Sequence, residues 1–361
     1  MMHSAAPDGT ATGFGVATAG RTATGFAVAV AATALLASPG TVAAQQTHIL
    51  VLTGLSGDPA YAEQFSEWAT TLIDTAIERY EVPAHQVAYL AEKVELDPER
   101  IDGRSTQENV EQAFADIAER AEPNDHVLVL LIGHGSHNSG ESRFNLPGRD
   151  LTAQDYAVLL DTLATQQVTF VNAATSSGGF IEALSGEGRT VMTATRSAGQ
   201  WNETVFGGYF VDAFADGEDE SDQNKDGRVS MLEAFEYAVV QVARAYEADG
   251  RLQTEHALLD DNGDGEGTRE PDPLTTDGAM ARASFLTTGD GSGLAGLPDD
   301  PSIRALYEER LALQEQVEGL RATRGGTDTT GYDAEMEKLL VALALKTRQI
   351  RSAEGDAAEP R

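Results

Sequence analysis

The sequence predicts an α/β domain in which helices cover both faces of a mostly parallel sheet, followed by a C-terminal helical hairpin. Apolar runs rich in Val, Leu and Ile alternate along the chain with segments of helical periodicity. This alternation is typical of parallel sheets whose strands are joined by crossover helices. The most apolar run, residues 126–133, indicates a central strand that is buried on both faces. Ligand sites in such sheets lie beyond the C-terminal ends of the strands.

The elements of this domain are predicted one by one from their patterns. In the first helix, apolar side chains recur every three or four residues from Phe65 to Ile77, and Pro83 follows its end. Thr106 is a suitable N-cap for the second helix. In chain order we predict a strand at 48–53, a helix at 60–80, a strand at 86–90, a helix at 106–121, the central strand at 126–133, a helix at 156–163, and strands at 167–172 and 190–195.

Residues 1–44 have the pattern of a secretory signal peptide. Their apolar core, residues 25–36, is shorter than the roughly 20 residues that span a bilayer. Small residues at 42–44 provide a cleavage site after Ala44. We therefore expect an exported protein, secreted or periplasmic, without membrane contact once the signal is removed. A retained membrane anchor is the alternative, because Arg21 is the only firm positive charge before the apolar core.

The remaining chain divides into one domain and an appendage. We expect the α/β domain to cover residues 45–272, a length that buries a sizeable core. Residues 273–300 become rich in Gly, Asp and Pro, which is typical of a linker. Residues 301–356 contain two segments with apolar residues at a spacing of three to four, which predicts a helical hairpin or coiled coil. This hairpin is expected to serve in packing or in homo-oligomer formation.

Composition excludes several functions. The chain contains no cysteine, so neither a disulfide nor a thiol nucleophile is available. Its formal net charge is −33 at pH 7, and such a surface repels nucleic acid and anionic lipid and attracts cations. Nucleic acid is therefore excluded as a partner, whereas a peptide or protein ligand is compatible with the charge. Solubility alone also accounts for the acidity.

Two of the predicted strands end in residues suited to chemistry. The central strand runs into His134, which stands between two glycines and whose ordinary pKa of about 6.5 suits proton transfer. The strand at 167–172 is followed by three hydroxyl residues before a double glycine, namely Thr175, Ser176 and Ser177. Hydroxyls at a sharp strand-to-helix turn can face a ligand. They can equally cap a helix that begins near Phe180.

Together these strand ends resemble the legumain family of cysteine peptidases, within the wider caspase-like group. The resemblance covers residues 48–215. It rests on the opening strand into Gly54, on the segment 123–136 with its His-Gly-Ser triplet, and on the Ser-Gly pair after the next strand. It implies a caspase/legumain-like fold, with His134 in the place of the family's general base and Gly135 in the place of its oxyanion glycine.

The chain departs from the family at the nucleophile. Alignment on the Ser-Gly pair puts Thr175 in the place of the catalytic cysteine, whereas a shift by one residue puts Ala174 there. A threonine hydroxyl is far less acidic than a thiol and needs a closer, stronger base. We therefore expect a degenerate peptidase that acts in binding or as a scaffold. The alternatives are a Ser/Thr-dependent hydrolase that uses His134 with Thr175 or a neighbouring serine, and an assembly protein that depends on its hairpin.

The resemblance also implies a substrate pocket. In the family, the segment that follows the next strand helps to form this pocket. The corresponding candidates in this chain are Thr195, Arg196, Asn202 and Glu203. Among them, Arg196 would favour an anionic group on the ligand.

Residues 222–233 match the twelve-residue calcium loop of an EF-hand at every diagnostic position. Gly227 stands at the sharp sixth position, and a helix predicted at 232–246 follows. The spacing predicts ligands from Asp222, Asn224, Asp226, the Arg228 carbonyl, Ser230 and Glu233. Because extracellular calcium is abundant, we expect the ion to stabilise an exported protein rather than to act as a signal.

A second acidic run repeats only the first half of this pattern. Its candidate ligands are Asp260, Asn262 and Asp264. The twelfth position is Pro271, which has no side-chain oxygen, so Glu270 or Asp272 would have to close the shell. The run is therefore a candidate for a second calcium ion or for extra ligands near the first.

Overall fold

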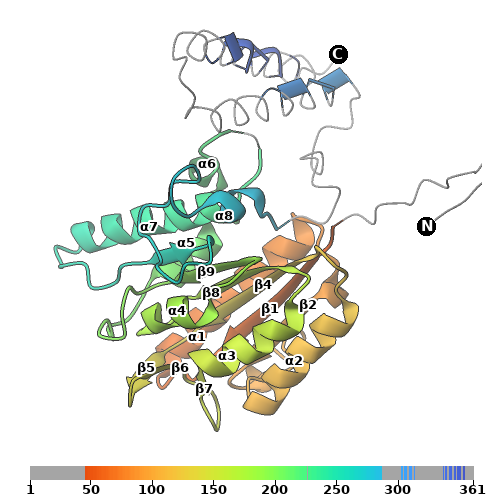
Figure 1. The fold of residues 1–361 in the computed structure, drawn as a ribbon. Helices are drawn as coiled ribbons and strands as arrows, with labels where there is room; N and C mark the ends of the chain where they lie inside the picture. Colours follow the sequence, from red (N-terminus) through yellow and green to blue (C-terminus); the bar gives the residue numbers. More distant parts are fainter. Residues whose placement is uncertain are drawn as a thin grey trace, which may run out of the picture. The chain divides into compact units, whose positions relative to one another are not determined.

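The computed structural model describes residues 45–286 apart from Asp226, together with separate short stretches between residues 302 and 353. The centre of the fold is a seven-stranded sheet with the order β10-β9-β8-β4-β1-β2-β3 (Figure 1). Neighbouring strands are parallel except that β10 runs antiparallel to β9. The strands are β1 (Thr47–Thr53), β2 (Val87–Ala91), β3 (Gly103–Arg104), β4 (His126–Ile132), β8 (Gln167–Asn172), β9 (Arg189–Thr193) and β10 (Leu258–Asp260).

Helices cover both faces of this sheet (Figure 1). One face carries α1 (Pro59–Glu78), α5 (Phe206–Asp212) and α7 (Met231–Ala248). The other face carries α2 (Gln107–Arg120), α3 (Ala153–Leu160) and α4 (Phe180–Leu184). The predicted fold class, an α/β domain with a mostly parallel sheet between helices, is therefore confirmed.

The central position of β4 explains why its sequence is apolar throughout. Its side chains alternate between the two cores, with Leu128, Leu130 and Ile132 in one and Val127, Val129 and Leu131 in the other. All six are fully buried. Because burial of one such side chain contributes about 1.5–3 kcal/mol, this strand is a major source of stability for the sheet.

Several helix boundaries follow from capping. The Thr106 side chain caps α2 at the amide of Asn109, as predicted. Helix α3 begins three residues earlier than predicted, because Thr152 and Asp155 form a capping box. Short 3-10 turns occur at η1 (Ala84–Gln86), η2 (Val94–Leu96), η3 (Asp161–Leu163) and η4 (Ser177–Gly179).

A small antiparallel sheet that the sequence analysis missed lies directly after β4. It consists of β5 (Gly135–Asn138), β6 (Glu141–Phe144) and β7 (Leu151–Thr152). These strands are short and mostly polar, so they lack the apolar runs by which strands are recognised. The hairpin of β5 and β6 fixes the course of the chain beyond His134.

The first part of the predicted linker belongs to the domain instead. Residues 273–286 pack on the domain and include a short helix, α8 (Ala279–Ala283). The Asp261 carboxylate accepts hydrogen bonds from the amides of Gly278, Met280 and Ala281, and Leu286 is fully buried. A side chain far back in the sequence thus holds a segment whose composition alone is typical of a linker.

Other predicted segments lie outside the described residues. These are the signal peptide at 1–44, residues 287–300 of the linker, and the turn of the hairpin predicted at 301–356. Every described residue between 302 and 353 is helical. Within the described part of the chain, no helix combines the length and the apolar character that a membrane span requires.

Candidate functional site

The ends of β4 and β8 meet at one edge of the sheet. The two strands are parallel neighbours, with Leu131 beside Asn172. The chain beyond them stays in contact, because a Cβ atom on Gly135 would lie 2.2 Å from the carbonyl oxygen of Thr175. Only glycine fits such an approach. The structure therefore brings together the residues that follow the two strands.

The hydroxyl of Thr175 is bonded to the main chain of Gly135 in both directions. It donates to the Gly135 carbonyl at 2.9 Å and accepts from the Gly135 amide at 3.0 Å. The Thr175 side chain is buried, with 4% of the residue exposed. The amide that the resemblance assigns to an oxyanion is thus directed at a threonine, and the threonine proton is directed at a carbonyl.

Ser177 is also engaged, in a small buried network with Thr195. Its hydroxyl lies 3.1 Å from the Thr195 hydroxyl and accepts from the Thr195 amide at 3.2 Å. The Gly178 amide donates to the same Thr195 hydroxyl at 3.1 Å. Thr195, predicted as a pocket residue, therefore holds the turn after β8.

Ser176 differs from its two neighbours. Its backbone adopts the left-handed conformation, with φ at 56°, and its amide donates to the Gln200 carbonyl at 2.9 Å. Its hydroxyl forms no hydrogen bond with another described residue, and it does not cap the turn that follows. Left-handed backbone is uncommon for serine and occurs frequently at functional turns. Gly179 precedes α4 without a side-chain cap, so the predicted hydroxyl cap for that helix is not formed.

The His134 ring packs against helix α1. Its centroid lies 4.8 Å from that of Tyr61 and 5.3 Å from that of Phe65, in edge-on contacts. Burial lowers the pKa of the imidazole below its ordinary value, and the Ser56 carbonyl and the Glu203 carboxylate oppose this only in part. His134 is therefore held neutral at neutral pH, as a general base or a ligand-facing acceptor must be.

Asn145, which the sequence analysis missed, joins the loops around His134. Its amide donates to the His134 carbonyl at 3.0 Å, and its own carbonyl accepts from the Leu55 amide at 2.9 Å. Its side-chain oxygen accepts from the Ser136 hydroxyl at 2.8 Å. Asn145 follows β6, whose presence the sequence did not reveal, so no signal in the pattern indicated its position.

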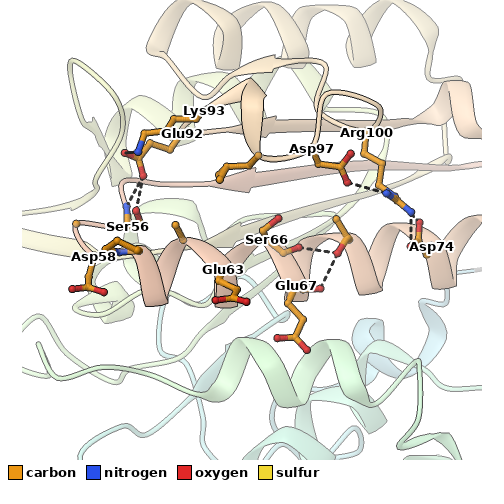
Figure 2. Close-up of a pocket in the computed structure, with 15 residues that line it drawn as sticks. Ser56, Asp58, Glu63, Ser66, Glu67, Asp74, Glu92, Lys93, Asp97 and Arg100 are labelled. Atoms are coloured by element: carbon orange, nitrogen blue, oxygen red, sulfur yellow. Dashed lines mark hydrogen bonds and ion pairs between the residues drawn. The ribbon is translucent and has the colours of Figure 1, made fainter.

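The loop after β1 is fixed by a carboxylate from the neighbouring strand. The Glu92 side chain accepts from the Ser56 amide at 3.0 Å and from the Ser56 hydroxyl at 2.6 Å (Figure 2). These bonds lower the pKa of Glu92, although desolvation acts against them. Ser56 is thereby held in place beside His134.

The other three predicted pocket residues, Arg196, Asn202 and Glu203, are exposed, and they separate into two groups. Glu203 acts on the His134 imidazole, and after desolvation it is the main cause of the raised pKa of Tyr61. Arg196 instead acts on His256: burial lowers the pKa of that imidazole, and the positive charges of Arg269 and Arg196 lower it further. Asn202 lies exposed in the same loop. The neighbouring Trp201, which the sequence analysis did not single out, is 76% exposed.

A second group missed from sequence lies beneath this loop. Glu255 is 1% exposed, and its carboxylate accepts from the amides of Val205 and Phe206 at the start of α5. Desolvation raises the pKa of Glu255 to about 7, against the lowering effect of these amides. The group therefore titrates near neutral pH.

The predicted calcium loop lies between α6 (Glu218–Ser221) and α7. Asp222 accepts from the Gly227 amide at 2.9 Å, and Glu233 accepts from the Asn224 amide at 3.2 Å. Glu233 also forms a capping box with Ser230 at the start of α7. The first and last predicted ligands, Asp222 and Glu233, thus both accept hydrogen bonds from amides of the loop between them. Asp226 lies outside the described residues.

Arg228, whose carbonyl is a predicted ligand of this loop, also contacts a residue outside it through its side chain. Its guanidinium carbon lies 3.5 Å from the centroid of the Phe285 ring. Ser230 forms an isolated β-bridge with the same Phe285. The second half of the loop therefore holds the segment that ends the described domain.

The second acidic run repeats the backbone conformation of the first. Positive φ angles occur at the fourth and sixth positions of both, at 59° and 84° in the first and at 80° and 77° in the second. Asp260 accepts from the amides of Gly263 and Gly265, as Asp222 accepts from Gly227. Asn262 and Asp264 bond to each other through a side-chain bond and a bond from the Asp264 amide. Among the described residues, no group of three His, Asp or Glu side chains is gathered as metal ligands.

Part of the chain is similar to a known protein family. Residues 87–257 match the model of the Peptidase C13 family. None of the curated proteins compared with the chain matches it. Similar solved structures include a structural-genomics target from Geobacter sulfurreducens (14% identity, 67% of this chain and 99% of that one, TM-score 0.42). Others are the Drosophila initiator caspase Dronc (11%, 66% and 84%, 0.36) and Caspase-1 from Spodoptera frugiperda (11%, 61% and 87%, 0.39).

The three structures are distant, and their TM-scores are all below 0.5. The likeness to the Peptidase C13 family therefore rests on the sequence match alone, which includes β4, β8 and the two loops that follow them. The chain is therefore similar to the Peptidase C13 family over residues 87–257.

Proposed function

We propose that this chain is an exported, calcium-binding protein whose legumain-like domain binds a peptide or protein ligand without cutting it. The observation that carries this proposal is the pair of hydrogen bonds between Thr175 and Gly135. A nucleophile must pass its proton to a base, and an oxyanion must find a free donor. Thr175 gives its proton to a carbonyl, and the Gly135 amide is already bonded to the threonine oxygen.

The alternative alignment, which puts Ala174 in the place of the catalytic cysteine, offers no nucleophile at all. Ala174 has no reactive group and is fully buried. Without a cysteine anywhere in the chain, no thiolate is available to the His134 imidazole. The residues around His134 therefore support recognition rather than peptide cleavage.

Calcium is part of the proposal on the strength of the loop 222–233. Support comes from its complete ligand spacing, from the glycine at its sixth position, and from the contacts of Asp222 and Glu233 with loop amides. The second run at Asp260 is proposed as a weaker, incomplete site. Export is proposed from the pattern of residues 1–44.

One observation favours a second candidate, a Ser-dependent hydrolase that uses His134. Ser176 has the left-handed backbone of a strained turn and a hydroxyl without a partner among the described residues. It follows a strand of the parallel sheet and precedes η4, which resembles the setting of hydrolase serines. Ser176, rather than Thr175, would then be the nucleophile.

A reactive-hydroxyl probe separates the two candidates. The full-length protein is treated with a fluorophosphonate and incubated with a mixed peptide library, and adducts and products are read by mass spectrometry. The non-catalytic proposal predicts neither. Labelling of Ser176 that is lost in His134→Ala would support the hydrolase and refute the proposal.

A further inference from the structure

We propose that the groove along helix α1, next to the candidate site, binds an extended peptide segment rich in Lys and Arg. The groove runs between α1 and the chain that follows β2 (Figure 2). Its volume is about 820 Å³. Such a volume accommodates more than one side chain. The inference names the ligand class of the proposed binding function and rests on that function.

The groove carries six carboxylates and two cationic side chains, and the cations are already paired. Arg100 binds both oxygens of Asp74 at 2.9 and 3.0 Å and also binds Asp97 at 2.9 Å. Lys93 lies 3.6 Å from Glu92. The carboxylates of the groove therefore outnumber its cations, and each cation lies beside a carboxylate.

Three further carboxylates on the α1 side of the groove have no cationic partner. Glu63 and Glu67 are exposed and form no ion pair with another described residue. Asp58 caps α1 through the Ala60 amide and is exposed. A strongly negative groove on a protein of net charge −33 attracts cations and repels phosphate and nucleic acid.

The occupant is a peptide rather than a metal ion. The carboxylates are spread along the groove, and no three of the described acidic side chains are gathered as metal ligands. Leu96, which is 44% exposed, lines the same groove with Pro59 and Ala62. Such apolar surface suits the methylene stems of Lys and Arg, whose charged ends then reach the carboxylates.

Helix α1 connects this groove to the candidate site. It presents Tyr61 and Phe65 to the His134 ring, and it presents Glu63 and Ser66 to the groove. Ser56 belongs to both the groove and the candidate site. It lines the groove, and its carbonyl bonds to the His134 imidazole and acts to raise its pKa. A peptide in the groove would therefore pass beside the imidazole.

The test measures binding of a fluorescent peptide in which Lys and Arg alternate with Ala, by anisotropy on the full-length protein. The neutral reference is the same peptide with acetyl-lysine and citrulline. Because surface charge pairs contribute little singly, Glu63→Gln with Glu67→Gln is expected to weaken binding of the basic peptide roughly threefold to tenfold.

Charge removed elsewhere provides the matched control. Glu108 and Glu119 are exposed on α2, on the opposite face of the sheet. Glu108→Gln with Glu119→Gln removes the same charge and is expected to change the affinity less than twofold. The groove proposal would be refuted if both double substitutions weakened binding equally. It would also be refuted if the neutral peptide bound the original protein as tightly as the basic peptide. Cleavage of the bound peptide would instead refute the non-catalytic proposal and leave the groove standing.

Discussion

The hydroxyl of Thr175 and the main chain of Gly135 exchange two hydrogen bonds, at 2.9 and 3.0 Å, across the gap between two neighbouring strand ends. In the site that resembles a peptidase centre, the candidate hydroxyl and the candidate oxyanion amide are therefore bonded to each other. The hydroxyl donates to one backbone group and accepts from another, and both groups would otherwise be open to a ligand. The proposal of a non-catalytic site rests on this pair of hydrogen bonds.

Removal of the Thr175 hydroxyl is expected to destabilise the domain. Thr175→Val keeps the shape but removes the side-chain partner of the half-buried amide and carbonyl of Gly135, so we expect a loss of about 1 kcal/mol in the free energy of unfolding. Thr175→Ser keeps both bonds and should lose less. Urea denaturation measures both variants, and a Val variant as stable as the original would show that the two bonds contribute nothing.

Gly135 itself is predicted to resist substitution. Gly135→Ala places Cβ 2.2 Å from the Thr175 carbonyl oxygen and 3.0 Å from that of Arg143, and overpacking of this kind costs about 1–3 kcal/mol. Gly199→Ala is the control, because its new Cβ would meet only the Ser197 side chain at 3.7 Å. Thermal unfolding should separate the two variants clearly. Equal melting temperatures would mean that the loop moves away without cost.

Calcium is expected to raise the melting temperature of the protein, because an ion that binds only the folded state stabilises it. Glu233→Gln should remove most of this increase, since the bidentate carboxylate closes the calcium shell. Comparison in EDTA corrects for any change to the capping box with Ser230. Asp264→Asn tests the second run in the same way and should have the smaller effect. Full calcium stabilisation of the Glu233→Gln variant would exclude the first loop.

The stability of the protein is expected to depend on pH through Glu255. Desolvation raises the pKa of this carboxyl to about 7 in the folded state, above its ordinary value. The folded protein then holds the proton more tightly than the unfolded chain, so this contribution is full at acidic pH and is lost as pH rises toward 7 and beyond.

Glu255→Gln should remove that dependence. The variant is predicted to gain stability relative to the original between pH 4.5 and pH 8, by roughly 3 kcal/mol for a shift of this size. Urea denaturation at a series of pH values gives the difference directly. A difference between the two proteins that stays constant with pH would show that Glu255 ionises normally.

Much of the fold follows from local pattern. The strands β4 and β8 are buried and mostly apolar, and their ends were predicted within a residue. The small sheet at 135–152 escaped prediction because it lies on the surface and is mostly polar. Segment 273–286 resembled a linker because its anchor, Asp261, lies far from it in the sequence.

The candidate site was predictable in place but not in detail. Parallel pairing of β4 with β8 implied that His134 and Thr175 follow neighbouring strand ends. The direction of each hydroxyl depends on the turn, and the turn depends on the left-handed Ser176 and on its bond to Gln200. Such a conformation costs energy at a serine and is held only by tertiary contacts, which a sequence pattern does not reveal.

The most direct test of the non-catalytic site is a thiol placed at residue 175. Because the chain has no cysteine, Thr175→Cys carries a single thiol whose alkylation rate can be followed against pH, with Ser176→Cys as the control for access. The account predicts an apparent pKa for the thiol at or above its ordinary value of about 8.5, unchanged by His134→Ala. An apparent pKa below about 7 that returns to the ordinary value in the His134→Ala background would show an imidazole poised to activate this position, and would contradict a non-catalytic site.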